Sequence, residues 1–370
     1  MEINLIKNER YILLLCCCTF FSINYLPINL IYILVFFLFI LGFSHFLLKM
    51  TIKKYSIYFF LFPVLFLLSQ FLGLHFNKFY FNNNVNILSP LLFFISWFLS
   101  FFLLQGLPYI PKERRIIIYN KLIKYSIIFF ILEFITRLFL YQGNKEFIYA
   151  FKKSFFYFDS NFTGLVILSI LAFSLYIEYR LKIKNKTKYI LLLLIILTLS
   201  RSAIFTSFIL IIITNNYLLN FKSKSYFLLS IILIVFSYMS IEYIFFSGNY
   251  QSIDGSFNSK FYIVKEAFHL YSTLPIENKL FGIGLGNTDL FLNIFAHNIF
   301  VTMFLEFGII GSLLFIIFII YSLFNSNHYC LFIWFPILIA GISLFGAYSP
   351  YLFIINAIIY FEENYYKLQS

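Results

Sequence analysis

The residues best suited to chemistry lie between Glu277 and Gly311, the longest stretch that hydrophobicity alone does not explain. His297 and Asn298 stand where a new apolar run begins, and Glu306 lies within that run. An imidazole group has an ordinary pKa of about 6.5, so a neutral His297 could take a proton from a hydroxyl group as a general base. The alternative is an interfacial histidine that bonds a loop carbonyl group. Titratable side chains at a membrane boundary are costly to bury, so we expect a water-filled site here.

Glu306 lies nine residues after His297, and three glycines lie before it. On a continuous α-helix, the step from His297 to Glu306 gives about 900° of rotation and about 13 Å of rise, so the carboxylate would point to the opposite face. Gly282, Gly284 and Gly286 stand at alternate positions. Their spacing differs from the dinucleotide motif G-x-G-x-x-G and no βαβ pattern surrounds them, so they predict a tight turn.

Three cations could bind an anionic group. Arg201 lies between Ser200 and Ser202, where two apolar runs meet. A guanidinium fork suits a diphosphate better than an ammonium group, which makes Arg201 a candidate diphosphate contact. The alternative is an arginine that extends to the membrane interface. Lys260 and Lys265 lie on the same predicted side of the membrane, where a lysine can face water or a lipid head group.

Both lysines belong to residues 259–271 (SKFYIVKEAFHLY), which have the spacing of a short amphipathic helix. Its predicted apolar flank consists of Phe261, Val264, Phe268 and Tyr271. We expect this helix to lie along the membrane interface, with its lysines facing water or a lipid head group.

Two polar pairs have mainly structural interpretations. Asp159 and Asn161 precede an apolar run and are typical of a helix N-cap, a role that needs no further function but does not exclude one. Glu133 and Arg137 are separated by one helical turn inside another apolar run and are predicted to pair with each other. A proton pathway is the alternative for the second pair.

The composition is that of an integral membrane protein. Of the 370 residues, 62% are hydrophobic and 11% are charged, whereas about a quarter are charged in soluble domains. The apolar runs are mostly about 18 to 22 residues long, enough for a helix to cross about 30 Å of hydrocarbon, and they lack the alternation of a transmembrane barrel. We predict an all-α polytopic bundle of about twelve helices (ten to twelve) that forms a single domain over residues 1–370. The predicted spans are 11–26, 28–48, 56–74, 87–107, 117–141, 161–179, 189–200, 202–220, 226–246, 297–321, 330–346 and 350–361, of which the last two could instead form a re-entrant hairpin.

The distribution of positive charge predicts the topology. Sixteen of the 27 Lys and Arg residues lie in one set of predicted loops and eight in the opposite set. Short basic loops stay in the cytoplasm, so both termini are predicted to be cytoplasmic. The opposite side then holds Asp159, the Arg201 turn, His297 and a long loop at 247–296, and a loop of this length is usually functional. Topology therefore explains the net charge of +12 without a nucleic-acid partner.

Missing motifs argue against several enzyme classes. The three aspartates, Asp159, Asp254 and Asp289, form no D-x-D motif, and the chain has no P-loop. We therefore expect no nucleotide-sugar chemistry, no metal ion and no cofactor. The four cysteines all lie in apolar runs and indicate neither disulfides nor metal ligands. A sugar donor would have to carry its own leaving group, such as a lipid diphosphate.

Three ordered patches resemble the C-terminal signature of the O-antigen polymerase and O-antigen ligase superfamily (Wzy and WaaL). They are SKFYIVKEAF at 259–268, ENKLFGIGLGN at 277–287 and AHNIFVTMFLEFGIIGSLLF at 296–315. SRSA at 200–203 and DSNFTG at 159–164 fall where that family has similar patches. The motif resemblance covers about residues 155–320. Lys260 stands where the family usually has Arg, and Val264 where it often has Trp.

The resemblance implies a GT-C-like, metal-independent, inverting glycosyltransferase. It would act on undecaprenyl-diphosphate-linked oligosaccharides, as donor and acceptor, at the periplasmic face of a bacterial inner membrane. The long loop at 247–296 would then be periplasmic, and a chain-length regulator protein would be a further partner. The residues used would be His297 as catalytic base, Arg201, Lys260 and Lys265 as diphosphate contacts, and Asn298, Asp159, Asn161 and Glu306 as supporting residues.

A polymerase is the preferred function, because the long loop is modest and the chain lacks a large soluble appendage. A ligase that transfers the same donor onto lipid A core is the close alternative. A flippase for the same lipid-linked unit would suit twelve spans and cationic cavities, but transporters often have two related halves, and the pattern at 277–311 has no counterpart in the first half. A protein O-glycosyltransferase of the same superfamily would typically be longer.

Overall fold

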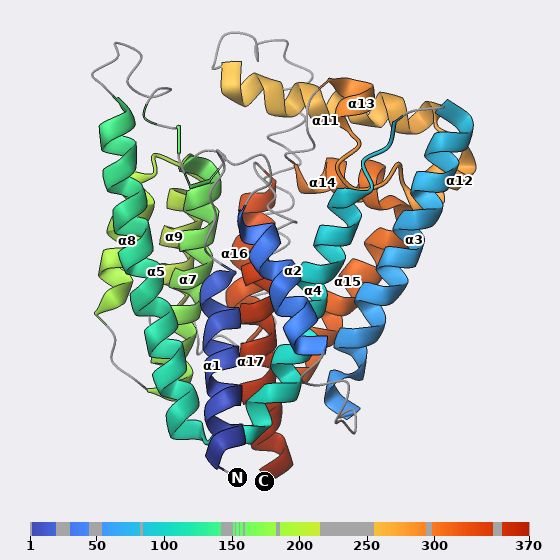
Figure 1. Cartoon of the computed structure of the whole chain (residues 1–370). Coiled ribbons are helices and arrows are strands. Elements are labelled where there is room, and N and C mark those ends of the chain that lie inside the picture. The colour runs from blue at the N-terminus through green and yellow to red at the C-terminus, as the bar shows by residue number, and fades with distance from the viewer. Residues whose placement is uncertain are drawn as a thin grey trace.

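The chain folds into a bundle of helices (Figure 1). The computed structural model describes residues 2–19, 30–43, 54–81, 84–141, 151, 153–154, 156–157, 160–182, 186–214, 255–293, 298–342 and 350–369, and these contain no β-strand. The helices are α1 (Glu2–Cys18), α2 (Leu30–Gly42), α3 (Ile57–Phe81), α4 (Leu88–Gly106), α5 (Lys112–Tyr141), α7 (Ser160–Leu181), α8 (Thr187–Leu197), α9 (Arg201–Thr214), α11 (Gly255–Thr273), α12 (Ile276–Phe281), α13 (Asp289–Leu292), α14 (Ile299–Val301), α15 (Gly308–Asn325), α16 (Leu331–Gly341) and α17 (Pro350–Gln369).

The predicted spans agree with these helices. Eleven of the twelve overlap a helix, and the span predicted at 226–246 lies outside the described residues. Within the described part, four helices are long and apolar enough to cross a membrane, namely Lys54–Phe81, Leu88–Tyr109, Ser160–Leu181 and Ile299–Asn325. The chain is therefore an all-α protein with several helices able to span a membrane, whereas the total of about twelve spans stays a prediction.

Within the described residues, the largest differences from the predicted bounds are at the start of α1 and at the end of α17. α1 begins at Glu2, nine residues earlier than predicted, because its charged first turns continue the same helix. One of these residues, Glu9, pairs with Arg114 of α5 at 3.1 Å. α17 continues to Gln369, eight residues beyond its predicted end at 361.

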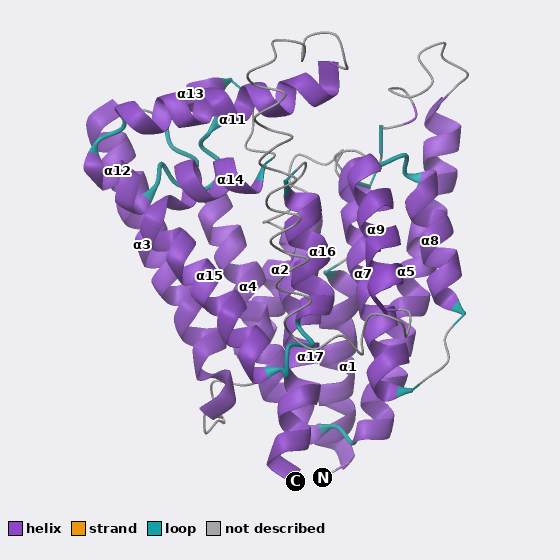
Figure 2. Cartoon of the chain, turned by 180° about the vertical axis from the view of Figure 1, so that it is seen from behind, coloured by secondary structure: helices purple, strands orange, loops and turns teal. Residues whose placement is uncertain are grey.

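Consecutive long helices run in alternating directions, and both termini lie at the same end of the bundle (Figure 1). α11 lies across the opposite end, where α7 and α9 begin (Figures 1 and 2). α5, α7, α8 and α9 pack together on one side and α3, α4 and α15 on the other, with α16 and α17 between them. This arrangement has the alternation that the distribution of positive charge predicts.

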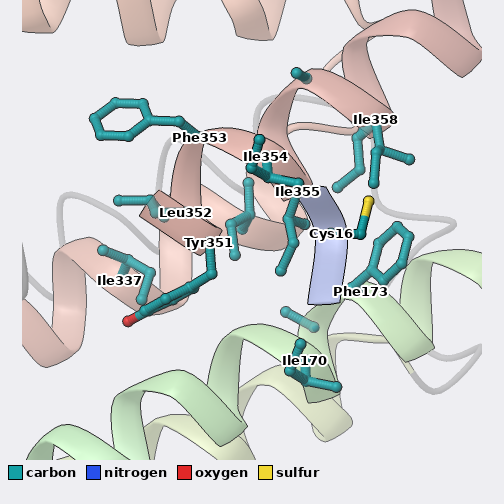
Figure 3. Close-up of a cluster of buried hydrophobic side chains, with 14 of the residues drawn as sticks. Cys16, Ile170, Phe173, Ile337, Tyr351, Leu352, Phe353, Ile354, Ile355 and Ile358 are labelled. Atoms are coloured by element: carbon teal, nitrogen blue, oxygen red, sulfur yellow. The ribbon is translucent and has the colours of Figure 1, made fainter. Parts of the chain in front are cut away.

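α17 forms the centre of the bundle. Every residue from Tyr351 to Phe361 is buried. Figure 3 shows this part of the helix beside Ile337 of α16, Phe173 of α7 and Cys16 of α1. A helix that is apolar on all sides requires neighbours all around it, which explains why this segment occupies the core.

Two adjacent carboxylates bond α17 to its neighbours at the end of the bundle where both termini lie. Glu362 is buried and accepts hydrogen bonds from Arg115 Nε at 2.7 Å and from Tyr119 Oη at 2.7 Å, both in α5. Glu363 accepts from Tyr176 Oη at 2.9 Å and from Arg180 Nε at 3.0 Å, both in α7. α5 and α7 are thereby joined through α17.

Candidate functional site

The tight turn predicted from the glycines is confirmed. α12 ends at Phe281, and Gly282, Gly284 and Gly286 follow with φ angles of 78°, 85° and 77°. At Gly282 an added Cβ atom would lie 2.7 Å from the backbone nitrogen of Gly308 and would also meet a carbonyl oxygen. Only glycine allows the turn to approach the helix after His297 this closely.

The prediction of one continuous helix after His297 is wrong. α14 is followed by a π-helical segment, Thr302–Phe307, and α15 begins at Gly308 with a φ angle of 67°. The glycine turn explains the break, because Ile283 N donates to Leu305 O at 2.8 Å in place of a bond within the helix. The rotation of about 900° that separates Glu306 from His297 assumes a regular α-helix. It does not apply here, because Glu306 belongs to the π-helical segment. Such π-helical insertions are frequent at functional sites.

A polar stripe on α3 holds the turn in place, and this stripe was not anticipated from the sequence. Gln70 accepts from Leu285 N at 2.8 Å and donates to Glu306 O at 3.2 Å, and Asn77 donates to Ile283 O at 2.8 Å. Gly73 lies between them, where an added Cβ atom would be 2.6 Å from a carbonyl oxygen of the turn. Their spacing of one and two helical turns within an apolar run was the signal that could have identified them.

The side chain of Glu306 faces the same region. It is buried, and its carboxylate accepts from Thr288 Oγ1 at 2.8 Å. Thr288 lies at the start of α13, immediately after the glycine turn. Glu306 therefore connects the π-helical segment to this loop.

Asn298 begins the helix as predicted. Its Oδ1 accepts from Phe300 N at 2.7 Å and caps α14, while its Nδ2 donates to Ile342 O at 2.6 Å. Ile342 directly follows α16, so the start of the broken helix is joined to the end of α16. His297 itself lies outside the described residues, and Asn298 fixes the chain immediately after it.

Arg201 is the first residue of α9 and is exposed. The turn before it is sharp, with a φ angle of 57° at Leu199. α7 packs tightly against this turn, because an added Cβ atom at Gly164 would lie 2.9 Å from Ser200 Cβ. Asn161 lies in the first turn of the same α7 and is half-buried, whereas Asp159 lies outside the described residues.

The amphipathic helix is confirmed as α11, but its buried face differs from the prediction. Ile263, Ala267 and Leu274 are buried against the start of the broken helix. Phe268, predicted for the apolar flank, is 55% exposed, although the centre of its ring lies 5.5 Å from the centre of the Phe304 ring. Val264 and Tyr271 of the predicted flank do pack against this cluster, so the prediction is correct for these two residues and wrong for Phe268.

Lys265 is exposed on α11, as predicted, whereas the side chain of Lys260 lies outside the described part. A small apolar pocket lies between α11 and the start of the broken helix. Its lining residues are Val264, Ala267, Phe268, Tyr271, Phe300, Val301 and Phe304.

The predicted pair of Glu133 and Arg137 is confirmed, with 2.9 Å between Oε1 and Nε. Among the described residues, no group of three His, Cys, Asp or Glu side chains could hold a metal ion. The structure thus joins Asn298 to α16 and encloses Glu306, while Arg201 and Lys265 stay exposed at the end of the bundle opposite the termini.

Comparison of the chain with family models, curated proteins and solved structures finds no match.

Proposed function

We propose that the chain is a polymerase of surface polysaccharide. It would transfer a growing glycan from undecaprenyl diphosphate to a sugar hydroxyl group of the next lipid-linked repeat unit. The observation that supports this most is the anchoring of Asn298 to the end of α16, because α16 also packs against α9, which begins with Arg201. Asn298, which follows the candidate base, and Arg201, a candidate diphosphate contact, are thus both linked to α16.

In the proposed reaction, His297 takes the proton of the acceptor hydroxyl group, and the oxygen attacks the anomeric carbon of the donor sugar. The bond between this carbon and the diphosphate breaks on the opposite side, which inverts the configuration. Arg201, with Lys260 and Lys265, stabilises the charge on the departing diphosphate. Asn298, Glu306, Asp159 and Asn161 support these residues, and neither a metal ion nor a cofactor takes part.

The proposed setting is a bacterial inner membrane crossed by about twelve helices of GT-C type. The end of the bundle with α11 would face the periplasm, and both termini would lie in the cytoplasm. The lipid bilayer and a chain-length regulator protein would be its partners.

The test is the surface polysaccharide ladder of a deletion strain complemented with wild type, His297→Ala or Arg201→Ala at matched protein levels. We expect both variants to leave one repeat unit on the lipid A core. The control is His75→Ala, an exposed histidine of α3, which should give a normal ladder. A normal ladder with His297→Ala would contradict the proposed base. Loss of every polysaccharide-bearing band, with long chains on undecaprenyl diphosphate, would instead indicate the ligase.

A further inference from the structure

Glu133 of α5 is fully buried at the centre of a polar cluster. Its Oε2 accepts a hydrogen bond from Arg137 Nε at 3.1 Å, and its Oε1 accepts from Ser154 Oγ at 2.8 Å and from Thr163 Oγ1 at 3.2 Å. These partners come from α5, from the segment before α7 and from α7 itself. One carboxylate therefore connects three parts of the chain.

Arg137 extends this cluster to α8. Its Nη1 donates to Leu197 O at 3.3 Å, and its guanidinium group lies 5.0 Å from the centre of the Phe151 ring. Leu197 is the last residue of α8, so this carbonyl group marks the start of the turn that leads to Arg201. The aromatic ring on one face of the guanidinium group and the carboxylate at its edge restrict its orientation.

The same turn is held from its other side by α7. Gly164 follows Thr163, and an added Cβ atom there would lie 3.1 Å from Thr198 Oγ1 and 2.9 Å from Ser200 Cβ. Thr198 Oγ1 also accepts from Ser200 N at 3.2 Å within the turn. The end of α8 and the start of α9 are therefore held by Gly164 of α7 and by Arg137.

A buried ion pair is a poor source of stability, because apolar residues of similar volume often stabilise a protein as well or better. What this pair supplies is a defined geometry, since the guanidinium group that donates to Glu133 through Nε also donates to Leu197 O through Nη1. The geometry that it defines is that of the turn before Arg201.

We propose that Glu133 is a positioning residue for Arg201. Through Arg137 it holds the end of α8 so that the Arg201 cation is presented to a diphosphate group. This inference rests on the proposed function, in which Arg201 contacts the donor diphosphate.

The test measures binding of farnesyl diphosphate to the detergent-purified full-length protein by calorimetry, with farnesol as the probe that lacks the anion. Charge-assisted hydrogen bonds are worth enough that Arg201→Ala should weaken diphosphate binding about tenfold or more. Glu133→Gln should weaken it by a similar factor, and adding it to Arg201→Ala should weaken it no further. Farnesol binding should not change.

Two further variants separate positioning from folding. Glu362→Gln breaks a buried ion pair at the opposite end of the bundle, so it should lower the melting temperature but leave diphosphate binding unchanged. Arg137→Lys keeps the charge beside Glu133 but lacks the fork that also reaches Leu197 O, so it should reproduce the weakening by Glu133→Gln.

If Arg201→Ala weakens binding but Glu133→Gln and Arg137→Lys do not, or act additively with it, the positioning role is overturned while the role of Arg201 stands. If Arg201→Ala binds the diphosphate like wild type, the proposed diphosphate contact fails, and the positioning role fails with it.

Discussion

Gly282 and Gly308 approach each other through their backbones, and this contact should not tolerate a side chain. We expect Gly282→Ala to destabilise the protein strongly, because its Cβ atom would lie 2.7 Å from Gly308 N and its φ angle is 78°. Backbone strain and overpacking each cost about 1 to 3 kcal/mol. The measurement is thermal unfolding of the detergent-solubilised protein, monitored by size-exclusion chromatography.

Gly311→Ala is the matched control, since Gly311 lies in α15, three residues after Gly308. An added Cβ atom there would have its nearest contact at 3.2 Å, with a side-chain atom of Phe307, so the melting temperature should change little. Equal melting temperatures for Gly282→Ala and wild type would mean that the glycine turn does not pack on the broken helix as described.

Local spacing was sufficient to predict some residues of the site but not others. The alternate glycines and the pair of Glu133 and Arg137 are short-range patterns, and the structure confirms both. Gln70 and Asn77 bond partners 215 and 206 residues further along the chain, so no local pattern identifies those partners. The role of His297 stays a prediction, because it rests on the motif resemblance and on the neighbouring Asn298.

Among the helices, α11 should depend on its apolar contact with the start of the broken helix. Ala267 is buried there in the same cluster as Val301 and Leu305. We expect Ala267→Asp to detach α11, because a carboxylate without a partner is costly to bury in apolar surroundings. Hydrogen exchange of the peptides covering α11 should rise by at least tenfold, which corresponds to about 1.4 kcal/mol or more.

Tyr262→Asp is the control for this experiment, since Tyr262 lies on the same helix and is 56% exposed. It should leave the exchange rate of α11 unchanged. Equal protection in Ala267→Asp and wild type would show that this contact does not hold α11.

α17 should depend on its carboxylates in a different way. Glu362→Gln leaves the Arg115 guanidinium group, which is 1% exposed, without its counter-charge. Loss of one partner of a buried pair typically costs about 3 to 5 kcal/mol, so the melting temperature should fall clearly. Replacing Arg115, Tyr119 and Glu362 together by Met, Phe and Leu should restore most of it. Failure of this triple variant to recover would mean that the polar cluster itself is needed for stability.

The extents of most helices could be predicted from apolar length alone, because a helix is the simplest structure that satisfies its backbone in lipid. The break at Gly308 could not be predicted in this way. Residues 297–321 form an apolar run with no proline, and the break arises from packing against the glycine turn. The buried face of α11 was predicted only in part, because its neighbour is the π-helical segment that the sequence did not reveal.

For the molecule as a whole, exposed apolar side chains support a membrane setting. Leu68 of α3 and Ile128 of α5 are each 55% exposed, and Leu132 is 51% exposed. These helices lie on opposite sides of the bundle (Figure 1). Large apolar side chains on the outer surface of a bundle are suited to contact with lipid, since an apolar surface of this extent is unusual for a soluble monomer.

The predicted orientation in the membrane can be tested with single cysteines in a variant whose four native cysteines are replaced by serine. Lys265 of α11 and Lys186, which precedes α8, are both exposed. α11 lies across the end of the bundle opposite the termini, whereas α8 begins towards the end where the termini lie (Figure 1).

A membrane-impermeant maleimide should therefore label Lys265→Cys in intact spheroplasts and Lys186→Cys only after lysis. The reverse pattern would place α11 in the cytoplasm, where no lipid-linked polysaccharide is polymerised in the proposed reaction. Labelling of both cysteines before lysis would mean that these two ends do not lie on opposite sides of the membrane.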